Sequence, residues 1–280
     1  MRQTAKRVVG VDFTSAPSRR KPIVVARAEL VGSTLTITQI DHLVDFAAFD
    51  TLLRERGPWV GAFDLPFGLP RELVTTMRWP KEWNELVTHV AAIGKDAFKD
   101  ALNAVRESRP MGARYIPRKG DAAAGSSSPM KLVNPPVGLM FFEGAPRIAR
   151  SGVSVMPCAP SVDTRVALEA YPGYMARKIT QHSYKKDGPE GRSPSRRSNR
   201  ELIVNALLDG HPAMSGLMVH VPEKLCELCI DDGNGDALDA VLCAVQAGIA
   251  LGEFDRGDLM FGIPRTADPL EGWIATVPAP

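Results

Sequence analysis

The sequence predicts an α/β fold in which a mixed sheet is flanked by helices. Three observations carry this prediction: short apolar runs that end in acidic residues, helical spacing between such runs, and a long, almost wholly apolar helix after Gly235. The 280 residues suffice for one large domain, and no internal repeat or clean linker divides them. We therefore predict a single domain over residues 1–280 with a long helical and irregular insertion at about residues 71–160.

The N-terminal part of the chain has the signals of four strands and one helix. The predicted strands are Val8–Asp12, Ile23–Leu30, Thr34–Ile40 and Val60–Asp64. The second and third are separated by Val31-Gly32-Ser33, as in a hairpin. The segment Asp45–Glu55 has helical apolar spacing and is ended by Gly57-Pro58.

The remaining elements are predicted from spacing and from helix-breaking residues. One or two helices are expected over Lys81–Ser108, a strand at Gly138–Phe142 and a short amphipathic helix at Arg200–Leu208. Two stretches rich in Gly, Pro and Ser, Pro110–Pro136 and Ser183–Arg200, are expected to be irregular loops.

Three apolar runs with strand character each deliver one carboxylate near their C-terminal end. These acids are Asp12, Asp64 and Glu169. The second run is stopped directly afterwards by prolines and a glycine. In open α/β sheets, ligands bind outside the carboxyl ends of the strands. The three acids are therefore candidates for one site.

Asp236 and Asp239 open the long apolar helix three residues apart, so both project from the same face. The helix is apolar nearly all round, which indicates burial, and two like charges at its start repel each other. A divalent cation would relieve that repulsion. The alternative is that Asp236 caps the helix after the turn 232–235 and Asp239 complements the helix dipole.

Several of these segments together resemble a known family. The motifs, in chain order, are Gly-Val-Asp-Phe-Thr-Ser-Ala at 10–16, Phe-Asp-Leu-Pro-Phe-Gly-Leu-Pro at 63–70, Lys-Leu-Val-Asn-Pro-Pro-Val-Gly at 131–138, Glu-Ala-Tyr-Pro at 169–172, Gly-Asp-Ala-Leu-Asp-Ala-Val-Leu-Cys-Ala at 235–244 and Glu-Gly-Trp-Ile at 271–274. They resemble the family called domain of unknown function 429 (DUF429), which is regarded as a predicted nuclease with an RNase H-like fold. The last helix is also similar to the Asp-x-x-Asp helix of RuvC-type Holliday-junction resolvases. The predicted order β-β-β-α-β agrees with the opening of an RNase H-like domain.

The expected chemistry is metal-assisted hydrolysis of a phosphodiester. Two Mg²⁺ or Mn²⁺ ions activate water and stabilise the leaving oxygen in such sites, and both prefer oxygen ligands. Asp12 is the expected bridging ligand, flanked by Asp64 and by the Asp236/Asp239 pair. Glu169 has three open roles: metal ligand, base, or ion-pair partner of a cation such as Lys185.

The expected partner is nucleic acid, because basic residues gather in the two predicted loops although the net charge is only +2. Six cations against two acids occur between Ser183 and Arg200, Arg192 among them. The candidate substrate-binding residues are Arg118, Lys131, Lys185, Arg196 and Arg197. The alternative is that the second loop is an ordinary solvated surface segment.

Two further function classes stay open at this point. The segment 12–15, Asp-Phe-Thr-Ser, fits the phosphate-binding turn of an actin-like ATPase or sugar kinase, although no second such turn follows in the chain. A non-catalytic binding protein is disfavoured, because buried acids without a metal destabilise a fold. The pair Cys226 and Cys229 has metal-ligand spacing but lacks the second pair that a zinc site requires.

Composition favours a cytoplasmic protein. The chain is 44% hydrophobic and 24% charged, and its four cysteines require no disulfide framework. The basic N-terminal residues lead directly into a strand, without the apolar segment of a signal peptide. No uninterrupted apolar run reaches the ~18 residues of a membrane span, so no membrane partner is expected. The oligomeric state is not predicted.

Overall fold

A seven-stranded mixed sheet forms the centre of the computed structural model, which describes residues 4–186 and 193–279. The sheet order is β5-β6-β4-β1-β2-β3-β7. The strands are β1 (Lys6–Asp12), β2 (Ile23–Val31), β3 (Thr34–Leu43), β4 (Trp59–Asp64), β5 (Ser154–Met156), β6 (Arg165–Glu169) and β7 (Met218–His220). β2 is antiparallel to β1 and β3, whereas β1, β4, β6 and β5 run parallel to one another. The predicted α/β fold with a mixed sheet is confirmed.

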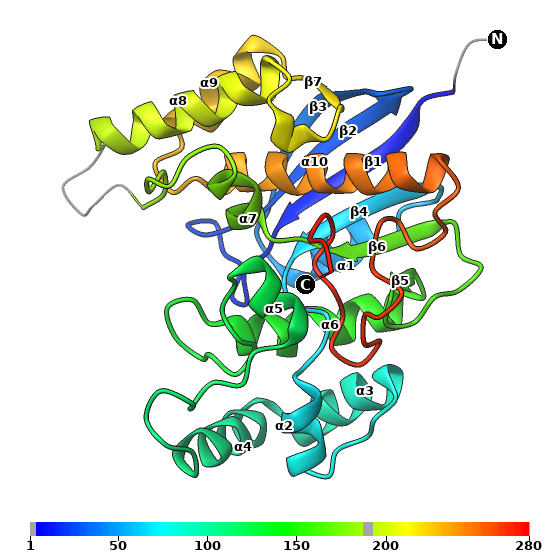
Figure 1. Cartoon of the computed structure of the whole chain (residues 1–280), viewed down its shortest axis with the longest axis vertical. Coiled ribbons are helices and arrows are strands. Elements are labelled where there is room, and N and C mark those ends of the chain that lie inside the picture. The colour runs from blue at the N-terminus through cyan, green and yellow to red at the C-terminus, as the bar shows by residue number, and fades with distance from the viewer. Residues whose placement is uncertain (1–3, 187–192, 280) are drawn as a thin grey trace.

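Helices cover both faces of the sheet (Figure 1). They are α1 (Phe46–Leu53), α2 (Arg71–Thr76), α3 (Trp83–Ile93), α4 (Lys95–Glu107), α5 (Lys119–Ala124), α6 (Val137–Ser151), α7 (Pro172–Arg177), α8 (Pro194–Leu208), α9 (Glu223–Asp231) and α10 (Asp236–Asp255). α10 lies on one face with α7, α8 and α9 packed around it, and α1, α3 and α6 contribute to the cluster on the other face. Figure 1 shows α2, α3 and α4 at the opposite end of the molecule from α8 and α9.

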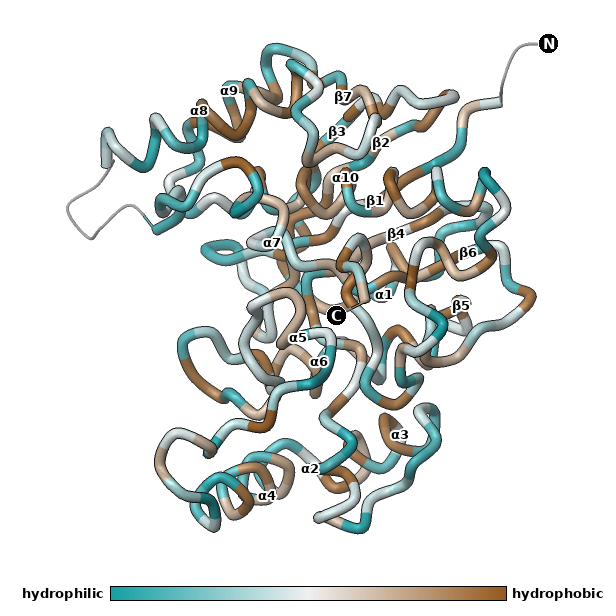
Figure 2. Tube along the Cα trace, viewed as in Figure 1, coloured by the Kyte–Doolittle hydropathy of each residue, from teal (hydrophilic) through white to brown (hydrophobic). Residues whose placement is uncertain are grey.

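Alternation along the central strands assigns each residue to one of these faces. Val8 and Ala62 pack in the cluster around α10, whereas Val9 and Phe63 pack in the cluster with α1 and α6. Figure 2 shows how apolar residues concentrate in α10 and the central strands. The same alternation carries forward to Asp12 and Asp64, which therefore belong to the α10 face.

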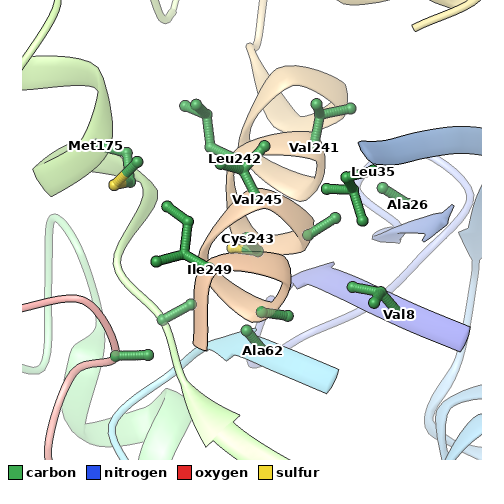
Figure 3. Packing of buried hydrophobic residues seen from close by; sticks show 14 of the residues in the cluster. Val8, Ala26, Leu35, Ala62, Met175, Val241, Leu242, Cys243, Val245 and Ile249 are labelled. Atoms are coloured by element: carbon green, nitrogen blue, oxygen red, sulfur yellow. The ribbon is translucent and has the colours of Figure 1, made fainter. Parts of the chain in front are cut away.

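α10 is the most deeply buried helix among the described residues, with an unbroken buried stretch from Ala237 to Leu251. Figure 3 shows its side chains packed between the strands and neighbouring helices. Length and composition alone would allow α10 to cross a membrane, contrary to our expectation from the sequence, but 83% of the relevant window is buried inside the protein. This burial is that of a core helix.

Gly10 allows α10 to lie directly against β1. A Cβ atom at Gly10 would overlap the backbone of Ala240 and Ala244, lying 2.7 Å from the Cα of Ala244. Only glycine fits where two backbones approach this closely. Since Asp12 is two residues after Gly10 and Asp239 precedes Ala240, this close approach also sets the distance between the two acids.

Gly10→Ala is therefore expected to destabilise the protein by on the order of 3 kcal/mol, because strand and helix must separate to admit the methyl group. Gly252→Ala is the matched control on α10, since its Cβ would meet only the Arg256 side chain at 3.6 Å. That control should be neutral or slightly stabilising. Chemical denaturation of both variants measures the difference, and equal stabilities would refute the packing argument.

Three predicted elements differ from the structure. Gly138–Phe142 is not a strand but the first part of α6, whose buried positions Phe141, Ala145 and Ile148 follow helical spacing. A five-residue apolar run is too short to show its period. The expected loop Ser183–Arg200 becomes helical from Pro194, where α8 begins, while Arg192 lies outside the described residues. The stretch Pro110–Pro136 contains the short helix α5.

Candidate functional site

Asp12 and Asp64 lie side by side at the ends of neighbouring parallel strands. The register of β1 with β4 pairs Asp12 with Asp64, so both side chains project from the same face of the sheet. Asp239, in the first turn of α10, faces them across the close approach at Gly10. One carboxylate oxygen from each of the three residues lies within 4.8 Å of the other two. The predicted convergence of these acids is thus confirmed for Asp12, Asp64 and Asp239.

Asp236 lies at the edge of this acidic site rather than within it. It lines the same cavity but does not belong to the group whose oxygens lie within 4.8 Å. The cap of α10 comes from Asp232, whose Oδ2 accepts a hydrogen bond from the Ala237 amide at 2.9 Å. The alternative in which Asp236 itself caps the helix is therefore wrong.

The three acids differ in their partners. No hydrogen bond or ion pair within the described residues engages the carboxylate of Asp12 or Asp64. Asp239 is only 1% exposed, and both of its oxygens are engaged: Oδ1 accepts from the Tyr184 hydroxyl at 2.6 Å and Oδ2 from the Lys185 ammonium. Asp12 and Asp64 thus offer free lone pairs, whereas both oxygens of Asp239 already accept hydrogen bonds from Tyr184 and Lys185.

Burial makes the charged forms of these acids costly. It raises the pKa of Asp12 well above its usual value, Lys185 offsets part of that rise, and the charge of Asp64 adds to it. Burial likewise raises the pKa of Asp64 to about 6, again against a lowering by Lys185. The pKa of Asp236 is raised by burial and by its neighbour Asp232. A bound cation would offset this cost directly.

The acids open into a cavity of about 990 Å³. Thr14 and Ser15, directly after β1, line it and are each 7% exposed, yet no hydrogen bond within the described residues engages either hydroxyl. Three exposed cations, Arg20, Lys21 and Lys186, also line the cavity, and none has an ion-pair partner in the described parts of the chain. The cavity therefore combines free carboxylates, free hydroxyls and free cations.

Glu169 lines the same cavity and its charge raises the pKa of Asp64, but it is offset from Asp64 by one residue of register. It pairs with Phe63 rather than with Asp64, so its side chain leaves the opposite face of the sheet from the three aspartates. There it accepts two hydrogen bonds from Arg118, at 2.5 and 2.8 Å, and one from the Phe67 amide at 2.9 Å. Of the roles left open for Glu169, ion pairing is the one observed, with Arg118 instead of Lys185.

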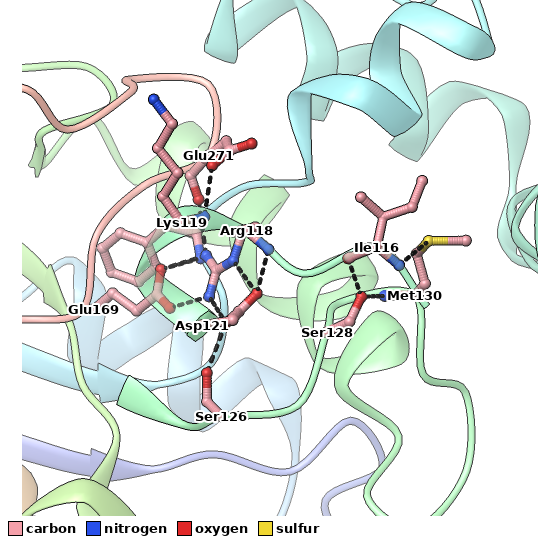
Figure 4. A network of polar contacts seen from close by, with 10 residues as sticks. Ile116, Arg118, Lys119, Asp121, Ser126, Ser128, Met130, Glu169 and Glu271 are labelled. Atoms are coloured by element: carbon pink, nitrogen blue, oxygen red, sulfur yellow. Dashed lines mark hydrogen bonds and ion pairs between the residues drawn. The ribbon is translucent and has the colours of Figure 1, made fainter. Parts of the chain in front are cut away.

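Arg118 is the centre of a buried polar network and not an exposed substrate contact (Figure 4). Its guanidinium, 3% exposed, also bonds to both carboxylate oxygens of Asp121, at 2.8 and 3.0 Å, and to the Glu271 carbonyl at 2.8 Å. Ser126 donates to the same Asp121 carboxylate at 2.7 Å. The network ties the loop after β4, the segment around α5 and the C-terminal segment to the end of β6.

The other predicted basic contacts divide between the site and the surface. Lys185 lies in the acidic site, where its ammonium pairs with Asp239. Lys131 is half-buried and does not line the cavity. Arg196 and Arg197 lie on α8 away from the cavity, and Arg197 pairs with Glu201 and Asp231.

Sequence reasoning missed Tyr184, Asp121 and Glu271. Tyr184 precedes Lys185, and Asp121 lies three residues after Arg118, a spacing that favours an ion pair on a helical turn. That spacing was the one available signal for the Arg118 network. The four cysteines are free, and Cys226 and Cys229 form no metal-ligand group with other described residues.

Comparison with known proteins assigns no relative to this geometry. No protein-family model, no curated protein and no solved structure matches the chain. A functional conclusion therefore depends on the residues of the acidic site and the cavity around it.

Proposed function

We propose that the protein is a metal-dependent hydrolase that cleaves phosphodiester bonds in nucleic acid. The observation that carries the proposal is the pair of carboxylates, Asp12 and Asp64, set side by side on adjacent strands without partners in the described chain. Two half-buried carboxylates side by side repel each other, and a ligand of opposite charge would relieve that repulsion. Asp239 supplies a third carboxylate within 4.8 Å.

The donor set fits Mg²⁺ or Mn²⁺. Carboxylate oxygens are the ligands that these hard cations prefer, and Mg²⁺ typically binds through one or two carboxylates together with water and substrate phosphates. Asp12 and Asp64 would hold the ion, and Asp239 would lie beside it. When bound, such an ion lowers the pKa of a coordinated water and draws charge from the phosphate oxygens.

The surrounding residues suit a phosphate-bearing substrate. The hydroxyls of Thr14 and Ser15 can donate to phosphate oxygens next to Asp12, while Arg20, Lys21 and Lys186 attract the charged backbone. Hydrolysis joins the water oxygen to phosphorus and breaks one phosphorus–oxygen ester bond. The proton lost by water ends on the leaving oxygen, giving a phosphomonoester and an alcohol.

The fold-family part of the proposal is an RNase H-like domain of the DUF429 type. An antiparallel β1-β2-β3 unit followed by α1 and by β4, parallel to β1, supports it. The strands of the described residues form a single sheet. An actin-like ATPase would resemble two fused copies of such a unit, so the observed single sheet favours the hydrolase over the kinase-like alternative. A cytoplasmic location belongs to the same proposal.

Divalent metal is expected to raise the melting temperature. At ten times its Kd, an ion that binds only the native state adds about 1.4 kcal/mol of stability, or a Tm rise of roughly 3–5 °C. Without metal, the raised pKa of Asp64 means that the native state keeps its proton up to about pH 6, whereas the unfolded chain releases it at a lower pH. The free energy of unfolding therefore falls as the pH rises through about 6. The metal-dependent rise should therefore be largest above pH 7 and shrink below about pH 6, where protons compete for the carboxylate.

Thermal unfolding with MgCl₂ or MnCl₂ at several pH values measures this response. Asp64→Asn removes one ligand and should abolish most of the rise. A melting temperature that stays flat up to millimolar metal in the wild type would contradict a metal site.

The activity test uses purified protein with Mn²⁺ and with EDTA. Single-stranded, duplex and branched DNA and RNA are the substrates, with ATP as the probe for the kinase-like alternative. Metal-dependent cleavage of a nucleic acid supports the proposal. Hydrolysis of ATP alone, or no metal-dependent product from any substrate, would overturn it.

A further inference from the structure

Lys185 places an ammonium group directly on the acidic site. Its Nζ pairs with Oδ2 of Asp239, while the adjacent Tyr184 donates its hydroxyl to Oδ1 at 2.6 Å. Asp239 is 1% exposed and the Lys185 side chain 32% exposed. The cation is thus anchored on the buried carboxylate from the cavity side, and the chain itself neutralises Asp239.

Among the described residues, no cation pairs directly with Asp12 or Asp64, although the charges of Lys185 and Lys21 lower the pKa of Asp12. Asp12 and Asp64 have no hydrogen bond or ion pair with any part of the chain that the structure describes. A second divalent ion between Asp12 and Asp239 would need an oxygen of Asp239 and would lie against the Lys185 ammonium. Two positive charges at contact distance in a partly buried site repel strongly.

The free hydroxyls independently indicate where a ligand binds. Thr14 and Ser15 follow Asp12 on the same loop, are more than nine-tenths buried, and line the cavity without a partner in the described chain. The hydroxyls are accessible from the cavity and free to donate to a ligand there. They adjoin Asp12, which ends the strand paired with Asp64, whereas the Asp239 side is already occupied by Tyr184 and Lys185.

We propose that the site holds one divalent ion, bound by Asp12 and Asp64, and that the Lys185 ammonium takes the place of a second ion beside Asp239. This inference rests on the proposed function and replaces the two ions expected from the sequence. Lys185 supplies an ammonium group close to where the substrate phosphate would bind. Metal binding then follows a single-site isotherm.

The test counts Mn²⁺ ions per chain by calorimetric titration and by the electron paramagnetic resonance signal of free Mn²⁺. The wild type is expected to bind one ion. Lys185→Met, which keeps an unbranched side chain one atom shorter but removes the charge, is expected to bind two, and Lys185→Gln serves as a second uncharged variant. Lys185→Arg and the control Lys186→Met, which loses a cation that contacts no acid in the described chain, should both bind one.

The outcomes separate this inference from the proposal beneath it. A wild type that binds two ions, or uncharged Lys185 variants that still bind one, would overturn the role of Lys185 and leave the metal site in place. A wild type that binds no ion at the acidic site would overturn the proposed function itself. Circular dichroism and thermal unfolding confirm that each variant is folded before its ions are counted.

Discussion

Asp12→Asn is expected to lower metal-dependent phosphodiester hydrolysis by about a hundredfold or more while leaving the fold intact. The amide keeps the shape of the side chain but loses the charge that holds a cation against Asp64. Because Asp12 has no hydrogen bond or ion pair in the described chain, the substitution breaks no structural contact. Removing one of several crowded acids should even leave the metal-free protein slightly more stable.

The measurement is the rate of substrate cleavage at saturating Mn²⁺, alongside thermal unfolding of the metal-free proteins. Asp209→Asn, an exposed aspartate at the end of α8, is the matched control and should retain full activity. If Asp12→Asn and the wild type cleave every substrate at the same rate, Asp12 does not take part in catalysis.

Arg118→Met is expected to destabilise the protein by about 3–5 kcal/mol. The substitution leaves Glu169 and Asp121 buried without the guanidinium that pairs with both, at 2% and 1% exposure. An uncompensated buried charge costs far more than the lost contact alone. The bidentate geometry matters as well, so Arg118→Lys should recover only part of the loss.

Urea unfolding of the purified variants measures this effect, with the exposed neighbour Lys119→Met as the control. The control should change the free energy of unfolding by less than about 0.5 kcal/mol. If Arg118→Met instead kept wild-type stability and lost only substrate affinity, the substrate-binding role expected from the sequence would be correct and the structural role wrong.

The centre of the fold follows from local patterns. β1, β2, β3 and β4 were predictable because each is an apolar run bounded by turn residues, and α10 because its apolar residues extend well beyond any strand. The same patterns place acids at the ends of two strands and at the start of one helix. Parallel strands end at the same edge, so the meeting of Asp12, Asp64 and Asp239 could be predicted as well.

The position of Glu169 could not be predicted from local sequence patterns. It also ends an apolar strand, and nothing in its own segment distinguishes it from Asp64. Its face depends on the register of β6 against β4, which pairs it with Phe63 and so turns it away from the acidic site. Register is a tertiary property, and the partner of Glu169 lies 51 residues away in an irregular stretch.

The loop predicted around the basic residues is wrong for a related reason. A cluster of arginines and serines without apolar periodicity is typical of a loop. In the structure, however, α8 begins at Pro194, and Arg197 on this helix pairs with Glu201 and Asp231. The sequence places Lys185 among the candidate substrate contacts, whereas its observed contact with Asp239 depends on how the segment after α7 crosses the start of α10. No spacing in the sequence encodes that crossing.

The most direct test of the metal site is a crystal structure of the protein grown or soaked with Mn²⁺ and measured at the manganese absorption edge. The account predicts an anomalous peak at about 2 Å from carboxylate oxygens of both Asp12 and Asp64, with the Lys185 ammonium still paired with Asp239. Well-ordered Asp12 and Asp64 side chains with no anomalous peak between them at millimolar Mn²⁺ would contradict it.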